Sequence, residues 1–117
     1  MGAQVDTIFD KILRKEIPAH IVFENEQVLA FNDINPVAPV HVLVISKVKR
    51  ESLRDIKQAS DSELSAFMRG LSEVASSLGL DKKGYRVVIN NGPDAQQSVA
   101  YLHAHIIAGK QLGWPPG

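Results

Sequence analysis

Short apolar runs bounded by polar residues and turn signals predict three short strands in the first half of the chain. Segments 20–25 (HIVFEN) and 27–34 (QVLAFNDI) meet at Asn25-Glu26 and predict a hairpin. After the proline-containing loop NPVAP, segment 41–47 (HVLVISK) is rich in β-branched residues and predicts a third strand.

Apolar residues three or four positions apart predict two helices. The first follows Asp6, a candidate N-cap, and ends before Pro18. The second is long, lies within segment 60–80 and has Gly79 as its stop signal. The apolar stripes consist of Ile8, Phe9 and Ile12 in the first helix, and of Leu64, Phe67, Met68, Leu71, Val74, Ala75 and Leu78 in the second.

Two more strands are predicted over 84–92 (GYRVVINNG) and 99–110 (VAYLHAHIIAGK), with a polar loop between them. Short connections between consecutive strands favour a mostly antiparallel five-stranded sheet with the helices on one face, which is an α+β fold. A chain of 117 residues has the size of one domain, so residues 1–117 are expected to form a single domain.

Composition argues against several classes of function. Thirteen Lys and Arg balance thirteen Asp and Glu, so no overall charge attracts the protein to nucleic acid or to an anionic membrane. The chain has no cysteine, which excludes disulfides, thiolate metal sites and thiol nucleophiles. The N-terminal segment resembles neither a secretory signal nor a membrane span, which predicts a cytoplasmic protein, or one also found in the nucleus of a eukaryote.

The segment YLHAHIIAGK carries the strongest chemical signal, because a strand would place His103 and His105 on one face with Tyr101. Two neighbouring imidazoles suggest a shared ligand, since two cations so close would repel each other. A metal ion with His41 as third ligand is one candidate, but no acidic residue stands beside this run to orient the imidazoles. Phosphate is favoured, because the preceding segment supplies neutral donors, namely Asn90, Asn91, Gly92, Gln96, Gln97 and Ser98.

Three other features of the sequence supply candidate functional residues. Asp33, beside the proline loop, is equally well explained as a turn cap and as an acceptor for a ribose diol. Trp114 lies in an irregular tail, where it is expected to cover another surface, such as that of a second subunit. Four apolar residues could form a slot for a nucleobase, although their spacing is more typical of a hydrophobic core. They are Ile8, Phe9, Ile12 and Phe31.

With these residues assembled, the chain resembles the histidine triad (HIT) superfamily, in particular its branch of histidine triad nucleotide-binding proteins. The similarity spans 6–47, 84–99 and 103–117 (HAHIIAGKQLGWPPG), of which the terminal WPPG is the most specific to that branch. The resemblance implies a HIT-like fold, which has a five-stranded sheet with one short and one long helix. It also implies a homodimer in which the sheet of one subunit continues into that of the other. Residues 1–5 are then expected to form a flexible arm, and 110–117 a tail toward the dimer partner.

The resemblance also implies an activity, the hydrolysis of adenosine or guanosine 5′-phosphoramidates and of acyl-adenylates, without a metal or another cofactor. His103 matches a nucleophile that forms a covalent nucleotidyl-histidine, and His105 matches a phosphate contact linked to protonation of the leaving group. The other matches are His41 in the hydrogen-bond network, Asn90 and Ser98 at the phosphate and leaving group, Asp33 at the ribose, Phe31, Asn32, Ile34, Ile8, Phe9 and Ile12 around the nucleoside, and Trp114 near the site of the partner subunit.

Three positions depart from the family pattern. Tyr101 replaces the first histidine of the triad, Lys49 replaces a further histidine, and AQQS at 95–98 replaces GGQS. The backbone carbonyl at position 101 is still available to hold the nucleophile, so we expect activity to survive. The alternative is a nucleotide-binding or scaffold protein with weak catalysis. A dinucleoside polyphosphate hydrolase is a third interpretation, which HAHIIAG and WPPG disfavour.

Overall fold

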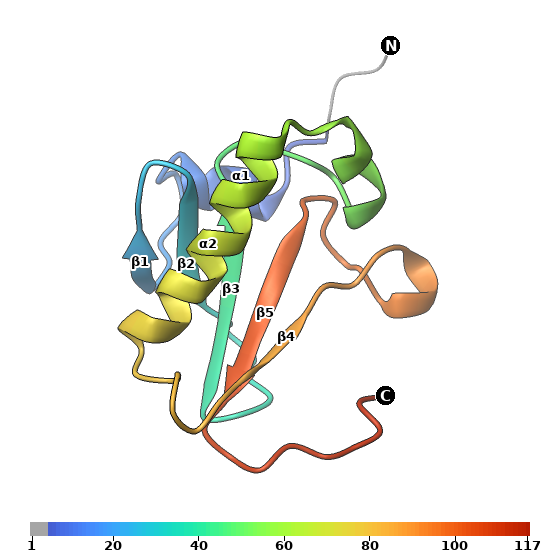
Figure 1. The fold of residues 1–117 in the computed structure, drawn as a ribbon. Coiled ribbons are helices and arrows are strands. Elements are labelled where there is room, and N and C mark those ends of the chain that lie inside the picture. Colours follow the sequence, from blue (N-terminus) through green and yellow to red (C-terminus); the bar gives the residue numbers. More distant parts are fainter. Residues whose placement is uncertain (1–4) are drawn as a thin grey trace.

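The structure is a computed structural model that describes residues 5–117 as a five-stranded antiparallel sheet with two α-helices (Figure 1). The strands lie in the order β1-β2-β3-β5-β4, and every neighbouring pair is antiparallel. The predicted α+β fold with an antiparallel five-stranded sheet is confirmed. The elements are α1 (Ile8–Leu13), β1 (Ile21–Glu24), β2 (Val28–Asn32), β3 (Val40–Ser46), η1 (Leu53–Gln58), α2 (Asp61–Ser77), β4 (Arg86–Val88), η2 (Pro93–Ala95) and β5 (His103–Ala108).

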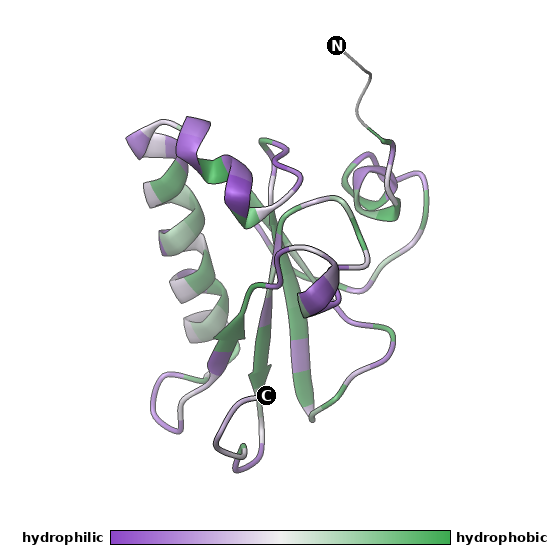
Figure 2. Ribbon diagram, turned by 90° about the vertical axis from the view of Figure 1, so that its right-hand side faces the viewer, coloured by the Kyte–Doolittle hydropathy of each residue, from purple (hydrophilic) through white to green (hydrophobic). Residues whose placement is uncertain are grey.

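The sheet has one helix on each face, so the expectation of both helices on one face was wrong. Figure 2 shows α2 on one side of the sheet and α1 on the other. Along β3, Val42 and Val44 pack in the core under α2, whereas Leu43 and Ile45 pack with Phe9 of α1. A strand that is apolar at consecutive positions is buried on both faces, and β3 has this pattern.

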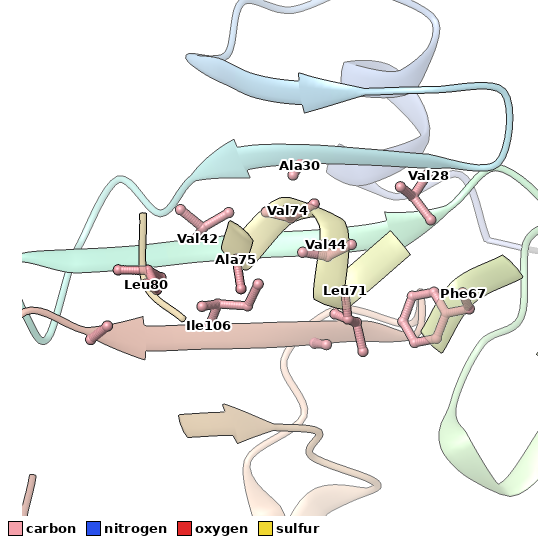
Figure 3. Packing of buried hydrophobic residues seen from close by; sticks show 12 residues of the cluster. Val28, Ala30, Val42, Val44, Phe67, Leu71, Val74, Ala75, Leu80 and Ile106 are labelled. Atoms are coloured by element: carbon pink, nitrogen blue, oxygen red, sulfur yellow. The ribbon is translucent and has the colours of Figure 1, made fainter. Parts of the chain in front are cut away.

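The larger core lies between α2 and the sheet (Figure 3). The helix ends before Gly79, whose φ of +74° is the left-handed conformation of a helix stop, as predicted. Its buried stripe is narrower than predicted, because Met68 is 62% exposed. Gly70 allows α2 to approach β2 closely, since a Cβ atom at this position would lie 2.7 Å from Val28.

The short helix α1 is capped by Thr7, whereas the sequence suggested Asp6. Thr7 donates from its backbone N–H and its hydroxyl to the Asp10 carboxylate at 2.7 and 2.8 Å, and the Asp10 N–H donates to the Thr7 hydroxyl at 3.2 Å. This reciprocal arrangement is a capping box. Asp6 instead forms an ion pair with Arg14 at 2.8 Å.

The strand β5 begins at His103, four residues later than the expected strand over 99–110. In the preceding segment, the Leu102 N–H donates to the Arg50 carbonyl at 2.7 Å and does not join the sheet. From His103 onward, β5 lies between β3 and β4 and pairs with both. The histidines therefore occupy an inner strand of the sheet.

The sequence predicted a flexible arm over residues 1–5 and a tail over residues 110–117. Residues 1–4 of the expected N-terminal arm lie outside the described residues, and Val5 is exposed, although its carbonyl accepts a hydrogen bond from Lys49. The direction of the 110–117 tail toward a dimer partner stays a prediction. Within residues 5–117, no helix has both the length and the hydrophobicity that a membrane crossing needs.

Candidate active site

Two histidines of β5 lie on the sheet face that α1 covers. The ring centroids of His103 and His105 are 5.0 Å apart. The ring of Phe9 in α1 packs edge-on to His103 at 4.9 Å, and His103 is only 7% exposed. The alternate residues Ala104 and Ile106 are fully buried under α2. The predicted separation of the histidines from the apolar face of this strand is confirmed.

A backbone carbonyl fixes the ring of His103. Its Nδ1 lies 2.7 Å from the carbonyl oxygen of Tyr101. Because a carbonyl can only accept, Nδ1 carries the hydrogen, and Nε2 of the neutral ring keeps its lone pair. The predicted contact is confirmed, although Tyr101 precedes the strand. His103 thus has the tautomer that a nitrogen nucleophile requires.

A second series of hydrogen bonds fixes the tautomer of His105. The Val37 N–H donates to Nδ1 of His41 at 3.1 Å, and Nε2 of His41 lies 2.9 Å from Nδ1 of His105. Since Nδ1 of His41 accepts, its Nε2 carries the hydrogen and donates to His105. The hydrogen of neutral His105 is therefore on Nε2, a buried atom with no hydrogen-bond partner among residues 5–117.

Burial favours the neutral form of both imidazoles. Removal from water lowers the pKa of His103 below its ordinary 6.5, although the Tyr101 carbonyl and the charge of Asp33 oppose the shift. Removal from water, together with the neighbouring His103 and His41, lowers the pKa of His105 to about 4. Near pH 7, His103 can therefore attack as a base-form imidazole, while His105 can donate from Nε2.

Asp33 is placed where it can serve both roles that the sequence left open. Its Oδ1 accepts the Asn35 N–H at 2.8 Å, which is the predicted turn cap. Its Oδ2 lies 3.4 Å from Nε2 of His41, and the side chain is 20% exposed. No acidic residue stands beside the HAH run in the sequence, but the pairing of β2 with β3 brings Asp33 to His41. The ribose contact of Asp33 stays a prediction.

A cavity of about 590 Å³ opens beside His103 and His105. Its volume lies in the usual range of sites for small molecules. The predicted site residues that line it are Ile8, Phe9, Ile12, Phe31, Asn32, Asp33, Ile34, Ser98, His103 and His105. Residues that the sequence did not assign also line it, namely Ile17, Pro18, Ala19, His20, Leu43 and Val99. Leu43 could have been found, because it alternates with His41 on a strand, whereas segment 17–20 carries no comparable signal.

Three predicted site residues do not line this cavity. His41 is joined to it through the hydrogen bond to His105. Asn90 follows β4 and has no role that the structure tests. Trp114 is 81% exposed and its ring lies 5.9 Å from the guanidinium carbon of Arg86. The roles of Asn90 and Trp114 therefore stay predictions.

The HIT domain family model matches residues 14–112 of the chain. The chain belongs to the HIT family. It is 47% identical to a "14 kDa zinc-binding protein" of Zea mays, over 95% of this chain and 88% of that protein. It is 48% identical to "Adenylylsulfatase HINT1" of Arabidopsis thaliana, over 95% of this chain and 76% of that protein.

Solved structures of HIT proteins confirm the fold. A HIT family hydrolase from Legionella pneumophila Philadelphia 1 superimposes with a TM-score of 0.88 at 38% identity, over 94% of this chain and 98% of that one. A histidine triad protein from Clostridium difficile gives a TM-score of 0.83 at 44% identity, over 96% of this chain and 97% of that one.

In this HIT protein His103 contacts the carbonyl of Tyr101, the residue that stands where the resemblance leads one to expect a histidine. Tyr101 is 1% exposed, and its hydroxyl donates to the carbonyl of Ser46 at the end of β3. Burial raises the pKa of Tyr101 to about 12, so the phenol stays neutral. Its ring centroid lies 6.3 Å from that of Phe9. The side chain therefore fills the space beneath α1, while its carbonyl holds His103.

The AQQS segment of this HIT protein is held by Gln97. The Gln97 side chain accepts the Gly92 N–H at 2.9 Å and donates to the Glu51 carbonyl at 2.7 Å. Gln96 has a φ of 60°, in the left-handed region that favours glycine. Ser98, which follows, is the member of the segment that borders the cavity.

The maize relative is named a zinc-binding protein, so the geometry of the possible zinc ligands in this HIT protein is relevant. Asp33, His41 and His105 offer ligand atoms that lie within 4.8 Å of one another. Zinc needs a lone pair on each ligand nitrogen, but Nε2 of His41 carries a hydrogen, because its Nδ1 accepts from Val37. That hydrogen joins His41 to His105. The residues therefore do not fit a zinc ion as they are arranged, and we derive no step through one.

Proposed function

We propose that this HIT protein hydrolyses nucleotidyl compounds, with adenosine or guanosine 5′-phosphoramidates and acyl-adenylates as substrates. The supporting observation is a pair of neutral imidazoles with opposite tautomers. Nε2 of His103 has a lone pair, and Nε2 of His105 carries a hydrogen without a partner in the described chain. Displacement at phosphorus uses both, because one atom attacks while the other donates to a phosphate oxygen or to the leaving group.

In the first step, Nε2 of His103 attacks the α-phosphorus, and the bond from phosphorus to the leaving amine breaks. The departing nitrogen takes the electron pair of that bond and a proton from a water molecule, while the hydrogen on Nε2 of His105 holds the departing group by a hydrogen bond. The nucleotidyl-imidazole is positively charged, and the Tyr101 carbonyl stabilises that charge through the hydrogen on Nδ1. The hydroxyl of Ser98, at the rim of the cavity, donates to the same leaving group.

In the second step, the hydroxide left by that water attacks the phosphorus, and the bond to His103 breaks with its electron pair returning to Nε2. Both imidazoles are then neutral as at the start, and the nucleoside monophosphate leaves. Each step inverts the configuration at phosphorus, so the two together retain it.

The apolar wall of the cavity is proposed to hold the purine base. Phe9 of α1 and Phe31 of β2 meet edge to face at 5.4 Å, and Ile8 and Ile12 extend the same wall. Aromatic and aliphatic walls with few polar groups are typical of sites for planar ligands. Asp33, at the polar end of this wall, is proposed to accept hydrogen bonds from the ribose hydroxyls.

The Arabidopsis relative named adenylylsulfatase supports the nucleotidyl half of this proposal. Adenylyl sulfate, acyl-adenylates and adenosine phosphoramidates share the AMP group and differ in what leaves the phosphorus. The covalent intermediate on His103 is the same for all of them. One nucleoside site can therefore serve several leaving groups.

The deciding experiment compares wild type with His103→Ala on adenosine 5′-phosphoramidate, with AMP affinity measured on the same samples. We expect turnover by wild type and a nucleotidyl adduct on His103, found by mass spectrometry after an alkaline quench. The variant is expected to lose about a thousandfold or more in kcat and still to bind AMP. Tight AMP binding without turnover that depends on His103 would instead identify a nucleotide-binding or scaffold protein, the alternative that Tyr101 leaves open.

A homodimer is proposed on a separate observation, the unpaired edge of the sheet at β4. Tyr85 and Val87 are 37% and 40% exposed at this edge, and apolar side chains there favour pairing with a second copy. Trp114 reaches the same edge through Arg86. Light scattering is expected to find a dimer for wild type and a monomer for Val87→Lys. Val48→Lys, a change at another exposed apolar residue, should leave the dimer intact.

A further inference from the structure

The wall that α1 gives to the cavity needs an anchor outside the helix. The helix has six residues, and helices this short are marginal in water unless tertiary contacts hold them. Phe9 and Ile12 are buried, but Ile8 is 50% exposed at the mouth of the cavity. The position of this wall therefore depends on what holds the N-terminal turn of α1.

Lys49, three residues beyond β3, contacts that turn directly. Its Nζ donates to the Asp10 carboxylate at 2.8 Å and to the Val5 carbonyl at 2.6 Å. The same carboxylate oxygen accepts both hydrogen bonds from Thr7 in the capping box. The Lys49 and Asp10 side chains are only 15% and 14% exposed. A largely buried ion pair thus joins the end of β3 to the cap of α1.

The ion pair also touches the surroundings of the nucleophile. Nζ of Lys49 lies 5.6 Å from the centroid of the Tyr101 ring, and Phe9 packs edge-on to both Tyr101 and His103. Burial acts to raise the pKa of Asp10, but the hydrogen bonds from Lys49 and Thr7 outweigh it and lower the pKa below its ordinary value. Asp10 is therefore charged at neutral pH.

From these contacts we propose that Lys49 is a positioning residue for the nucleoside, acting through Asp10 and α1. Without its ammonium group, the Asp10 carboxylate keeps a largely buried charge with no counter-charge, and the first turn of α1 moves toward water. Ile8 and Phe9 then leave their places in the cavity wall. The hydrogen bonds that fix His103 and His105 do not pass through Lys49, so the loss falls on nucleoside affinity and spares the rate of the bound substrate.

The proposal rests on the proposed function, and its test uses a binding readout that does not need turnover. Lys49→Met keeps an unbranched side chain over Tyr101 and removes the charge. We expect Kd for adenosine, by calorimetry, and KM for adenosine 5′-phosphoramidate each to rise about tenfold, with kcat within about twofold of wild type. Lys49→Arg, which restores the charge, should recover most of the affinity.

A matched control is available on the neighbouring residue Lys47, whose Nζ lies 2.8 Å from Glu24 in an ion pair that includes no residue of α1. Lys47→Met is expected to leave adenosine affinity unchanged. Asp10→Asn tests the same pair from its other side and should weaken adenosine binding as Lys49→Met does. If Lys49→Met does not fold, the Kd of Asp10→Asn decides the proposal.

The two variants together give a sharper test. In the Asp10→Asn background, Lys49→Met should add little to the loss of adenosine affinity, because the contact is already gone. Additive losses, an unchanged Kd in either single variant, or a fall in kcat alone would each overturn the proposal. A wild-type protein that binds adenosine without hydrolysing the phosphoramidate contradicts the proposed function only, and the Kd comparison still decides on Lys49.

Discussion

Nε2 of His41 donates a hydrogen bond to Nδ1 of His105 across 2.9 Å, and this bond determines which nitrogen of His105 carries a proton. Nδ1 of His41 accepts the Val37 N–H, so a backbone amide in the loop before β3 sets the tautomers of both rings. Reversal of this order would turn a lone pair of His105 toward the negatively charged phosphate of the proposed substrate. The loop that precedes β3 therefore takes part in the proposed chemistry by fixing these tautomers.

His41→Ala tests this relationship. The variant frees His105 to protonate at Nδ1, so kcat is expected to fall about 10- to 100-fold. Nitrogen NMR of the histidine rings should show His105 protonated at Nε2 in wild type and a mixture of tautomers in the variant. A wild-type rate together with an unchanged tautomer would rule out the role given to His41.

The pH dependence of kcat/KM follows from the lowered pKa of His103. Above that pKa the ring is neutral and can attack, and below it the ring is protonated and cannot. Because burial moves this pKa below 6.5, kcat/KM should be level above about pH 7.5 and fall in acid. His105, with a pKa of about 4, stays neutral over the level range.

The measurement is kcat/KM for adenosine 5′-phosphoramidate across about pH 4.5 to 8.5, with uncatalysed hydrolysis subtracted. His103→Ala supplies the baseline at each pH. An inflection at pH 7 or above would contradict the burial argument.

Tyr101→Phe separates the two contributions of this residue, because it removes the hydroxyl and keeps the carbonyl and the ring. The Ser46 carbonyl loses its donor, so the free energy of unfolding should fall by about 1 to 2 kcal/mol in urea titrations. Since His103 keeps its hydrogen bond, kcat should change less than about tenfold. Tyr85→Phe, at a half-exposed tyrosine, serves as the control and should change neither quantity. A loss of kcat as large as that of His103→Ala would mean that the phenol acts in the chemistry.

Asp33→Asn tests the proposed ribose contact with the turn cap kept, because the amide oxygen of Asn can still accept the Asn35 N–H. AMP should bind about tenfold more weakly, since the ribose hydroxyls lose a charged acceptor. The binding of 2′,3′-dideoxy-AMP should be nearly the same for variant and wild type. Equal losses for both ligands would place Asp33 in another role.

Much of the fold could be predicted from the sequence, because periodicity reports burial directly. The strands β3 and β5 and the helix α2 follow from such patterns, and Gly79 marks the end of α2. The side of the sheet that α1 covers does not follow from the sequence of α1 itself, because the apolar stripe of a short helix fits either face. The apolar residues at consecutive positions of β3, such as Val42 and Leu43, were the available signal for two buried faces.

Parts of the candidate site that depend on local sequence spacing could be predicted. Parts that depend on the pairing of strands or on the path of a loop could not. His103 and His105 are apparent from their spacing of two. The approach of Asp33 to His41 depends on the register of β2 with β3, and the acceptance of the Val37 N–H depends on the path of a loop. The contact of Lys49 with Asp10 joins residues 39 positions apart, and no sequence pattern reports it.

Because side chains alternate between the two faces of β5, a change in the number of residues within this strand should be poorly tolerated. His103 and His105 line the cavity, while Ala104 and Ile106 fill the core under α2. A deletion or insertion of one residue inside the strand would exchange the two sets, since side chains alternate with a period of two. The imidazoles would then face the hydrophobic core under α2, and the aliphatic side chains would face the cavity. Single substitutions along β5 change one side chain at a time, whereas a change of its length by one residue reverses the faces of all the residues that follow.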